Sequence, residues 1–408
     1  MVLYEEGDVA GSPVNAGLSR RLSGELREMQ EQGVYKQLLH ILGTQGPVVR
    51  LEDFGETVNL CSNNYLGLCD VREIVEAVRV GAAKYGAGTS SVRFICGTWD
   101  VHRDLESRIA DFLETEASVT YTSCWNANEG LFAPLLGDED ALISDELNHA
   151  SIIDGIRLCK AERHVYGHMD MNALEDVLRK TRDARHRLVI TDGVFSMEGE
   201  IAPLPDIREL CDRYDAVMAI DDSHATGVLG ETGRGTPEHY GMHGEVDIIT
   251  STLGKALGGM AGGFTASSRP VVDYLVQRSR TQLFTNAIPP HSACGAMAAI
   301  DYLEEHPELV TRLRQNTTYF RRQLTALGYD PVEGDTPIVP VIIGETAAAI
   351  RLSRELLQEG VFVIGFGYPV VPKGAARIRC QVSAAHGREH LDRALDALEK
   401  VGKRLGVI

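Results

Sequence analysis

Short apolar runs alternate with amphipathic helical stretches through most of this sequence, from about residue 60 onward. The apolar runs are rich in β-branched residues, and each ends in polar residues or glycine. This alternation is typical of a mainly parallel α/β sheet, because neighbouring parallel strands need a crossover segment between them, usually a helix. We therefore predict strands at seven places: 118–123, 141–145, 164–167, 187–193, 216–222, 246–253 and 262–267.

The length of 408 residues exceeds that of one compact domain, and the pattern changes after Pro289 and Pro290. A long helical stretch is predicted from there to about residue 327, followed by strands PIVPVII, VFVIGF and ARIRCQVS interleaved with two helices. The predicted fold class is thus α/β, with a mostly parallel central sheet and a smaller C-terminal α/β domain. The predicted divisions are an N-terminal extension and helical arm (1–58), a large domain (59–290) and a small domain (291–408).

Within the arm, residues 1 to about 18 are expected to form a mobile extension, and the charged segment LSRRLSGELREMQEQG a solvated surface helix. The start of the chain has neither the basic nor the apolar region of a secretory signal, and no apolar run reaches membrane-spanning length. The formal net charge of -18 argues against a nucleic-acid or anionic-membrane partner, so an anionic ligand needs a local positive site. Eight cysteines without C-x-x-C pairs or zinc-like histidine spacing indicate reduced thiols in the cytoplasm and no metal site.

Several polar residues stand where the predicted strands end. Ligands of open parallel sheets bind at the carboxyl ends of strands, so these residues are expected to share one site. They are Cys124, Trp125, Ser196, Asp221, His224 and Lys255.

A lysine, a carboxylate and small donors together suit pyridoxal phosphate (PLP). That cofactor needs an amine for its aldehyde, a carboxylate against its pyridine nitrogen and donors for its phosphate. Lys255, among glycines and apolar residues, has few carboxylates nearby in sequence to hold its charge, which favours a lowered pKa. The main-chain amides at Cys124 and Trp125, which open a helix, would bind phosphate. Taken singly, Asp221 could cap a helix and Cys124 could be a small core residue; the prediction depends on the set.

Two further segments indicate a substrate site. Asn63 lies in LCSNNYLGL, a polar segment between apolar flanks that suits a buried loop facing a ligand, although an Asn-rich turn explains it as well. Arg377 and Arg379 alternate along a predicted strand and therefore share one face. A guanidinium suits an amino-acid carboxylate, whereas the alternative is a salt-bridged surface strand.

The segments that carry these residues resemble the α-oxoamine synthases, a family of PLP enzymes of the fold type I, or aminotransferase class I and II, kind. The resemblance covers residues from about 58 to the C-terminus. It rests on CSNNYLGL, SVRFICGT, SDELNHASIIDGIRLCKA, TDGVFSMEGEIAPL, IDDSHATGVLGETGRG, STLGKALGG and GYPVVPKGAARIRCQVSAAH.

The resemblance implies a role for each matching position. Lys255 would bind the cofactor's aldehyde and act as acid and base, Asp221 would face the pyridine nitrogen, His224 would bind the phenolic oxygen and His149 would stack on the ring. Asn63 and Arg379 would bind the amino-acid carboxylate. The remaining contacts to the cofactor and its phosphate would come from Cys124, Trp125, Ser196 and Thr252, and from Thr285 and Asn286 of a neighbouring subunit in a homodimer with shared sites.

Within the family, the chain is similar to members that condense glycine with acetyl-coenzyme A to give 2-amino-3-oxobutyrate through a quinonoid carbanion. It departs from them at Trp125, where Phe is usual, at Trp99, where a polar residue is usual, and at Cys380, where Thr is common. A larger indole beside the cofactor could change the acyl pocket. Two enzymatic alternatives therefore stay open: a synthase that joins alanine to a pimeloyl thioester, and a relative in specialised metabolism with another electrophile. The third alternative is a non-catalytic scaffold with the same fold.

Overall fold

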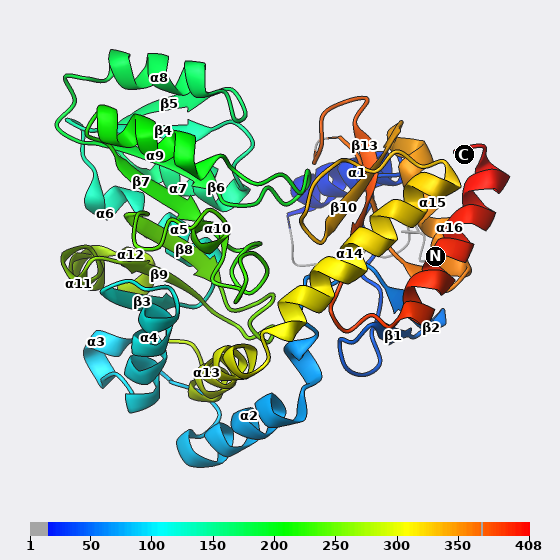
Figure 1. Ribbon diagram of the computed structural model, residues 1–408, viewed down its shortest axis with the longest axis horizontal. Coiled ribbons are helices and arrows are strands. Elements are labelled where there is room, and N and C mark those ends of the chain that lie inside the picture. The colour runs from blue at the N-terminus through cyan, green and yellow to red at the C-terminus, as the bar shows by residue number, and fades with distance from the viewer. Residues whose placement is uncertain (1–14, 369) are drawn as a thin grey trace.

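The computed structural model describes residues 15–368 and 370–408, which form two units side by side (Figure 1). A seven-stranded sheet forms the larger unit, and two three-stranded sheets form the smaller one. Helix α14 (Glu308–Leu327) connects them, because Val310 and Leu313 pack in the core of the larger unit and Phe320 and Leu324 in that of the smaller.

The seven-stranded sheet has the order β3-β9-β8-β7-β6-β4-β5. Only β9 runs against its neighbours, so the sheet is mostly parallel and the predicted fold class is confirmed. All seven predicted strands are present, and each of their ends lies within two residues of the predicted one. They are β3 (Ala117–Tyr121), β4 (Ala141–Asp145), β5 (Glu162–Tyr166), β6 (Arg187–Asp192), β7 (Val217–Asp221), β8 (Ile248–Thr252) and β9 (Gly263–Ser267).

Both faces of this sheet are covered by helices, which explains why its central strands are buried at almost every position. In β6, Val189 belongs to the core cluster on one face, whereas Leu188 and Ile190 belong to the cluster on the other. The first cluster includes α4 (Asp100–Phe112), α8 (Met171–Lys180), α9 (Leu204–Arg213) and α13 (Pro290–Glu305). The second includes α5 (Cys124–Glu129), α6 (Phe132–Leu135), α7 (Ala150–Leu158) and α11 (Arg269–Arg278).

The smaller unit combines distant parts of the chain. Strands β10 (Ile338–Gly344), β13 (Ala376–Gln381) and β12 (Ile364–Phe366) form an antiparallel sheet that packs with α15 (Thr346–Gln358) and α16 (Arg388–Leu405). Strand β2 (Gly55–Asn59) pairs with β1 (Val48–Leu51) on one side and with β11 (Val361–Phe362) on the other. Residues 48–59 therefore join the C-terminal unit, while α13 packs on α2 (Arg72–Tyr85) and α4. The domain divisions at 58 and 290 stay predictions.

The structure differs from the sequence predictions at three places. The long helical stretch is interrupted after α13, where Pro307 precedes the first residue of α14 and donates no main-chain N–H. The predicted strand VFVIGF is divided at Val363 between β11 and β12, which belong to different sheets. Helix α1 (Ala16–Glu31) begins inside the segment that was expected to be mobile; the rest of that segment, residues 1–14, lies outside the described residues.

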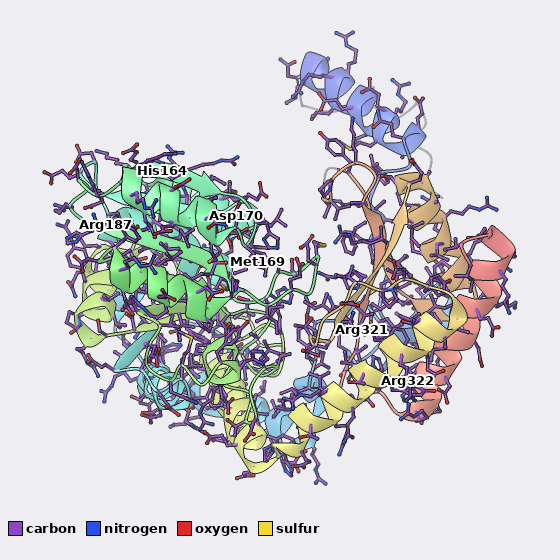
Figure 2. All side chains as sticks on the ribbon, turned by 45° about the horizontal axis from the view of Figure 1, so that its top comes forward. His164, Met169, Asp170, Arg187, Arg321 and Arg322 are labelled. Carbon is purple, nitrogen blue, oxygen red and sulfur yellow. The ribbon has the colours of Figure 1, made fainter. Side chains whose placement is uncertain are left out.

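Helix α1 is the predicted solvated helix, and it has no buried residue. Figure 2 shows it standing clear of the two units. Asn15 caps its start by accepting hydrogen bonds from the main-chain nitrogens of Gly17 and Leu18. Within the described part of the chain, no helix is long and apolar enough to cross a membrane. The remaining short helices are η1 (Leu68–Asp70), α3 (Arg93–Cys96), α10 (Thr236–His239) and α12 (Arg280–Leu283).

Candidate active site

A cavity of about 160 Å³ lies at the carboxyl ends of β3, β6, β7 and β8. Its position is the one expected for a ligand of a parallel sheet. Eight residues singled out from the sequence line it, from five separate segments: Cys124, Trp125, His149, Ser196, Asp221, His224, Thr252 and Lys255. Five lining residues were not predicted: Ser123, Ser151, Asp192, Val194 and Ser223. Among the described residues, no cluster of His, Cys, Asp and Glu could hold a metal ion.

Lys255 lies in the turn that follows β8. Burial lowers the pKa of its amine. The charges of Asp221 and Asp192 raise this pKa, but the effect of burial is larger. Gly258 and Gly259, at φ +82° and +67°, give the turn a backbone that other residues rarely adopt. A lysine with a lowered pKa loses its proton more readily, and the neutral amine can act as a nucleophile and as a base.

Asp221 ends β7 and is 5% exposed. Its carboxylate accepts hydrogen bonds from the main-chain nitrogen of Ser223 (3.0 Å) and from the side-chain nitrogen of Asn128 (2.7 Å). The thiol of Cys124 lies 3.6 Å from the same carboxylate. Sequence reasoning missed Asn128. Its position four residues after Cys124, on the same face of α5, was the available signal.

His149 caps the start of α7, with its ring edge-on to Trp125 at 5.9 Å between centroids. Burial lowers the pKa of the imidazole, and the charge of Asp221 opposes this only in part. The main-chain nitrogen of His149 donates a 3.0 Å hydrogen bond to Asp192. Burial, with the charge of Asp221, raises the pKa of Asp192 well above its usual range. The cavity thus combines a neutral imidazole with a carboxyl group that favours its protonated form.

His224 is the second histidine of the cavity, and it is 8% exposed. Its Nδ1 lies 2.8 Å from the hydroxyl of Tyr65, which is completely buried. Burial first, and then the charges of Lys255 and Arg379, hold the pKa of this imidazole well below its usual range. The ring is therefore neutral and presents one donor and one acceptor nitrogen.

Neither predicted substrate residue lines the cavity, but Arg379 contacts its wall. Arg379, on β13, donates a 2.9 Å hydrogen bond to the main-chain oxygen of Ser196, a lining residue. Asn63 has a buried side-chain oxygen without a hydrogen-bond partner among the described residues. Arg377 and Arg379 both point to the segment 196–198, as predicted for one face. Arg377 is buried in an ion pair with Glu198 (3.2 Å) and so is not on a surface strand.

Thr285 and Asn286 do not line the cavity of their own chain. They follow α12, next to Phe284, which is 66% exposed, and Asn286 is exposed as well. Their predicted contact with a cofactor would therefore have to be made in another subunit.

The donor set fits PLP. Lys255 can bind an aldehyde and Asp221 can pair with a pyridine nitrogen, while the hydroxyl of Ser223 is buried in the cavity wall without a partner among the described residues. A buried hydroxyl without a partner is costly unless a ligand satisfies it. The set therefore meets the requirements of that cofactor.

Comparison with known proteins agrees with this geometry. A profile of the family described as aminotransferase class I and II matches residues 55–398. The 2-amino-3-ketobutyrate coenzyme A ligase of Escherichia coli K12 is 48% identical over 95% of this chain and 98% of its own. The 8-amino-7-oxononanoate synthase of Thermosipho melanesiensis is 44% identical over 94% and 98%. A solved structure of a variant of serine palmitoyltransferase from S. paucimobilis, with a bound PLP-myriocin aldimine, superposes with a TM-score of 0.91. Its sequence is 27% identical, and the match covers 97% of this chain and 100% of the other.

Proposed function

This chain belongs to the aminotransferase class I and II family and, within it, to the α-oxoamine synthases; from that premise we propose that it condenses glycine with acetyl-coenzyme A to give 2-amino-3-oxobutyrate and coenzyme A. The observation that carries the proposal is the nearly full-length likeness, at 48% identity, to 2-amino-3-ketobutyrate coenzyme A ligase. The cofactor is PLP, for which the cavity has the required donors.

Each part of the cofactor has a proposed partner. The amine of Lys255 binds the aldehyde, Asp221 pairs with the pyridine nitrogen and His224 donates to the phenolic oxygen, while His149 stacks on the ring. Donors for the phosphate are the main chain at Cys124 and Trp125, with Ser196 and Thr252. When bound, the cofactor withdraws electrons from the α-carbon of the amino acid, and the charge of Asp221 supports this by keeping the ring nitrogen protonated.

Lys255 moves the proton. Arg379 and Asn63 would hold the carboxylate of glycine, so that its amine could replace the amine of Lys255. The freed amine, whose pKa is lowered by burial, then removes a proton from the α-carbon. The electron pair left on that carbon attacks the thioester carbonyl of acetyl-coenzyme A, a carbon-carbon bond forms and the carbon-sulfur bond breaks as coenzyme A leaves. A donor at His149 can polarise the thioester oxygen during this step.

The proposal includes a homodimer with shared sites. Thr285 and Asn286 are outside the cavity of their own chain but match the family segment that binds phosphate across the subunit boundary. The exposed ring of Phe284 beside them suits burial against a second copy of the chain. We also propose a cytoplasmic location, which is consistent with eight unpaired cysteines.

Release of coenzyme A thiol tests the reaction. Purified protein with PLP is assayed with glycine or alanine as the amino acid, and with acetyl- or pimeloyl-coenzyme A as the donor. We expect glycine with acetyl-coenzyme A to give the highest kcat/KM. A preference for alanine and the pimeloyl donor would instead support an 8-amino-7-oxononanoate synthase, to which the chain is also 44% identical.

A second measurement tests the cofactor. Wild-type protein is expected to be yellow, and Lys255→Ala to lose the visible absorbance that depends on the lysine bond. Protein that stays colourless after addition of PLP would overturn the enzymatic proposal and favour a non-catalytic scaffold.

A further inference from the structure

Four side chains form a continuous hydrogen-bonded row from the smaller unit to the cavity. Gln381 lies between Arg379 and Tyr65. In the orientation that satisfies both neighbours, its amide oxygen accepts from Nε (2.8 Å) and Nη2 (3.1 Å) of Arg379, and its amide nitrogen donates to the hydroxyl of Tyr65 (3.1 Å). The hydroxyl of Tyr65 lies 2.8 Å from Nδ1 of His224. Neither Gln381 nor Tyr65 lines the cavity.

Arg379, at the start of the row, determines which group donates and which accepts in each hydrogen bond that follows. A guanidinium donates only, so the oxygen of Gln381 must face Arg379 and its nitrogen must face Tyr65. The hydroxyl oxygen of Tyr65 accepts that bond. Among the described residues, Nδ1 of His224 is its other hydrogen-bond partner, so the buried O–H is satisfied when it points to His224. Nδ1 of His224 must then be the acceptor. Since the ring is neutral, its proton is on Nε2.

We propose that Gln381 and Tyr65 are positioning residues that hold His224 as the tautomer protonated on Nε2, so that it donates a hydrogen bond into the cavity. The inference rests on the proposed function, in which the acceptor of that bond is the phenolic oxygen of the cofactor. The arginine that receives the amino-acid carboxylate thereby also determines the proton position of the histidine.

The middle of the row is buried. Tyr65 is completely buried, and its main-chain oxygen accepts a 2.7 Å hydrogen bond from the nitrogen of Ala384. Gln381 is 1% exposed and belongs to β13, two residues after Arg379 on the same face. The charged and titratable groups that act on His224 are Lys255, Arg379 and His149, and all three favour its neutral form.

Arg379 can serve the row and a substrate together. A guanidinium has five N–H groups. Within the described chain, Gln381 takes one from Nε and one from Nη2, and the main-chain oxygen of Ser196 takes one from Nη1. One N–H on each terminal nitrogen is left for a carboxylate, which suits a two-point contact.

A variant that reverses the hydrogen bond between residue 381 and the hydroxyl of Tyr65 tests the inference. In Gln381→Glu, of almost the same shape, the carboxylate accepts from Arg379 and also from the hydroxyl of Tyr65. The tyrosine oxygen must then accept from His224, so the histidine proton should move to Nδ1. Tyr65→Phe removes the donor to Nδ1 altogether. The matched control is Tyr329→Phe, which removes another buried hydroxyl whose partner is the main-chain oxygen of Leu398.

Nitrogen NMR of the full-length protein, labelled with ¹⁵N-histidine, reads the tautomer directly. The signals of His224 are assigned by their loss in His224→Gln. We expect a protonated Nε2 in wild type and in Tyr329→Phe, and a protonated Nδ1 in Gln381→Glu. A protonated Nδ1 in wild type, or an unchanged tautomer in Gln381→Glu, would overturn the inference.

The visible absorbance of bound PLP gives the second readout. Loss of the Nε2 donor makes the phenolic oxygen more basic, so the pH midpoint of this absorbance should rise by about one unit in Gln381→Glu. It should rise by less in Tyr65→Phe, where the tautomer protonated on Nε2 is no longer favoured by a donor to Nδ1. It should stay unchanged in Tyr329→Phe. If Gln381→Glu does not fold, an unchanged midpoint in Tyr65→Phe overturns the inference. If wild type binds no PLP, the proposed function fails, and NMR of the unloaded protein still decides the tautomer.

Discussion

The side-chain amide of Asn128 donates a 2.7 Å hydrogen bond to the carboxylate of Asp221, across 93 residues of sequence. The same nitrogen lies 2.9 Å from the hydroxyl of Ser151, and the amide oxygen accepts a 2.8 Å hydrogen bond from the hydroxyl of Thr250. Asn128 is completely buried. One amide therefore fixes the charged group that the proposal places against the cofactor's ring nitrogen.

Replacing Asn128 should weaken both the fold and cofactor binding. Asn128→Ala leaves three buried polar groups short of a partner, at a cost of about 2–4 kcal/mol in the free energy of unfolding. It also frees the carboxylate of Asp221 to turn, so we expect the Kd for PLP to rise roughly tenfold. Thermal unfolding and a titration of visible absorbance with PLP measure the two effects.

Asn316→Ala is the matched control for Asn128→Ala. Asn316 also donates two hydrogen bonds, to the main-chain oxygens of Ser383 and His386, outside the cavity. It should lower Tm and leave the Kd for PLP unchanged. An unchanged Kd in Asn128→Ala as well would mean that the amide has only a structural role.

His168 makes the stability depend on pH. Burial alone would lower the pKa of this imidazole, but hydrogen bonds to Asp145 (3.0 Å) and Glu200 (2.9 Å) outweigh it and raise the pKa from 6.5 to about 9. The ring also packs edge-on against Phe195, at 4.4 Å between centroids, next to Ser196 of the cavity. A group whose pKa is raised by folding stabilises the protein while it is protonated.

The contribution of His168 should be complete below pH 6.5 and should disappear as the pH rises through about 9. Denaturant unfolding of wild type and His168→Gln over this range measures it. We expect a difference of about 1–2 kcal/mol at low pH, since Glu200 is partly exposed and solvent screens its charge. His40→Gln, which removes the exposed pair with Glu52, serves as the control. A difference that grows with pH would contradict the assignment.

Trp125 is predicted to limit the size of the acyl group. It is one of two tryptophans in the chain, and it lines the cavity edge-on to His149. Trp125→Phe removes part of this wall, so kcat/KM for propionyl- relative to acetyl-coenzyme A should rise about tenfold, the lower end of the usual effect of one methylene group. The other tryptophan, Trp99, has a similar edge-on contact with His102 outside the cavity.

Trp99→Phe is therefore the control for Trp125→Phe. Because Trp99 packs against the core of the larger unit, its replacement should reduce stability and leave the ratio of the two acyl donors unchanged. An equal change of the ratio in both variants would show that the effect is transmitted through stability and not through the wall of the cavity.

Much of this site was predictable because its residues lie at the carboxyl ends of strands. Asp221 ends β7 and Lys255 follows the end of β8 by three residues, and parallel strands bring their carboxyl ends to one edge of the sheet. The motifs added His149, which no local pattern singles out. The roles of these residues stay predictions, although the structure brings them into one cavity.

What could not be predicted depends on contacts between distant segments. Tyr65 looks like an ordinary core residue until the fold brings it to His224, and the spacing of Asn128 from Cys124 does not reveal its contact with Asp221. The same is true of β2, which pairs with β11 from the other end of the chain. The helix break at Pro307, in contrast, was readable from the sequence, since proline cannot donate to the preceding turn.

Shared sites in a homodimer predict that two inactive variants restore each other. The first is Lys255→Ala, which damages the cavity of its own chain. The second carries Thr285→Ala and Asn286→Ala, which would damage the cavity of the partner. In a mixed dimer, one site has both defects and the other has none. If subunits exchange freely, half of the dimers are mixed and one of their two sites works, so activity should return to about a quarter of wild type.

Mixing Lys255→Ala with Asp221→Ala provides the control for this complementation. Both residues line the cavity of the same chain, so every site of the mixed dimer has one defect and no activity should return. The subunits are exchanged by mild denaturation and dialysis with PLP, and release of coenzyme A thiol from glycine and acetyl-coenzyme A is measured. Full activity of the Thr285→Ala, Asn286→Ala variant alone, or no recovery on mixing it with Lys255→Ala, would place these two residues outside the active site and remove the reason for a shared one.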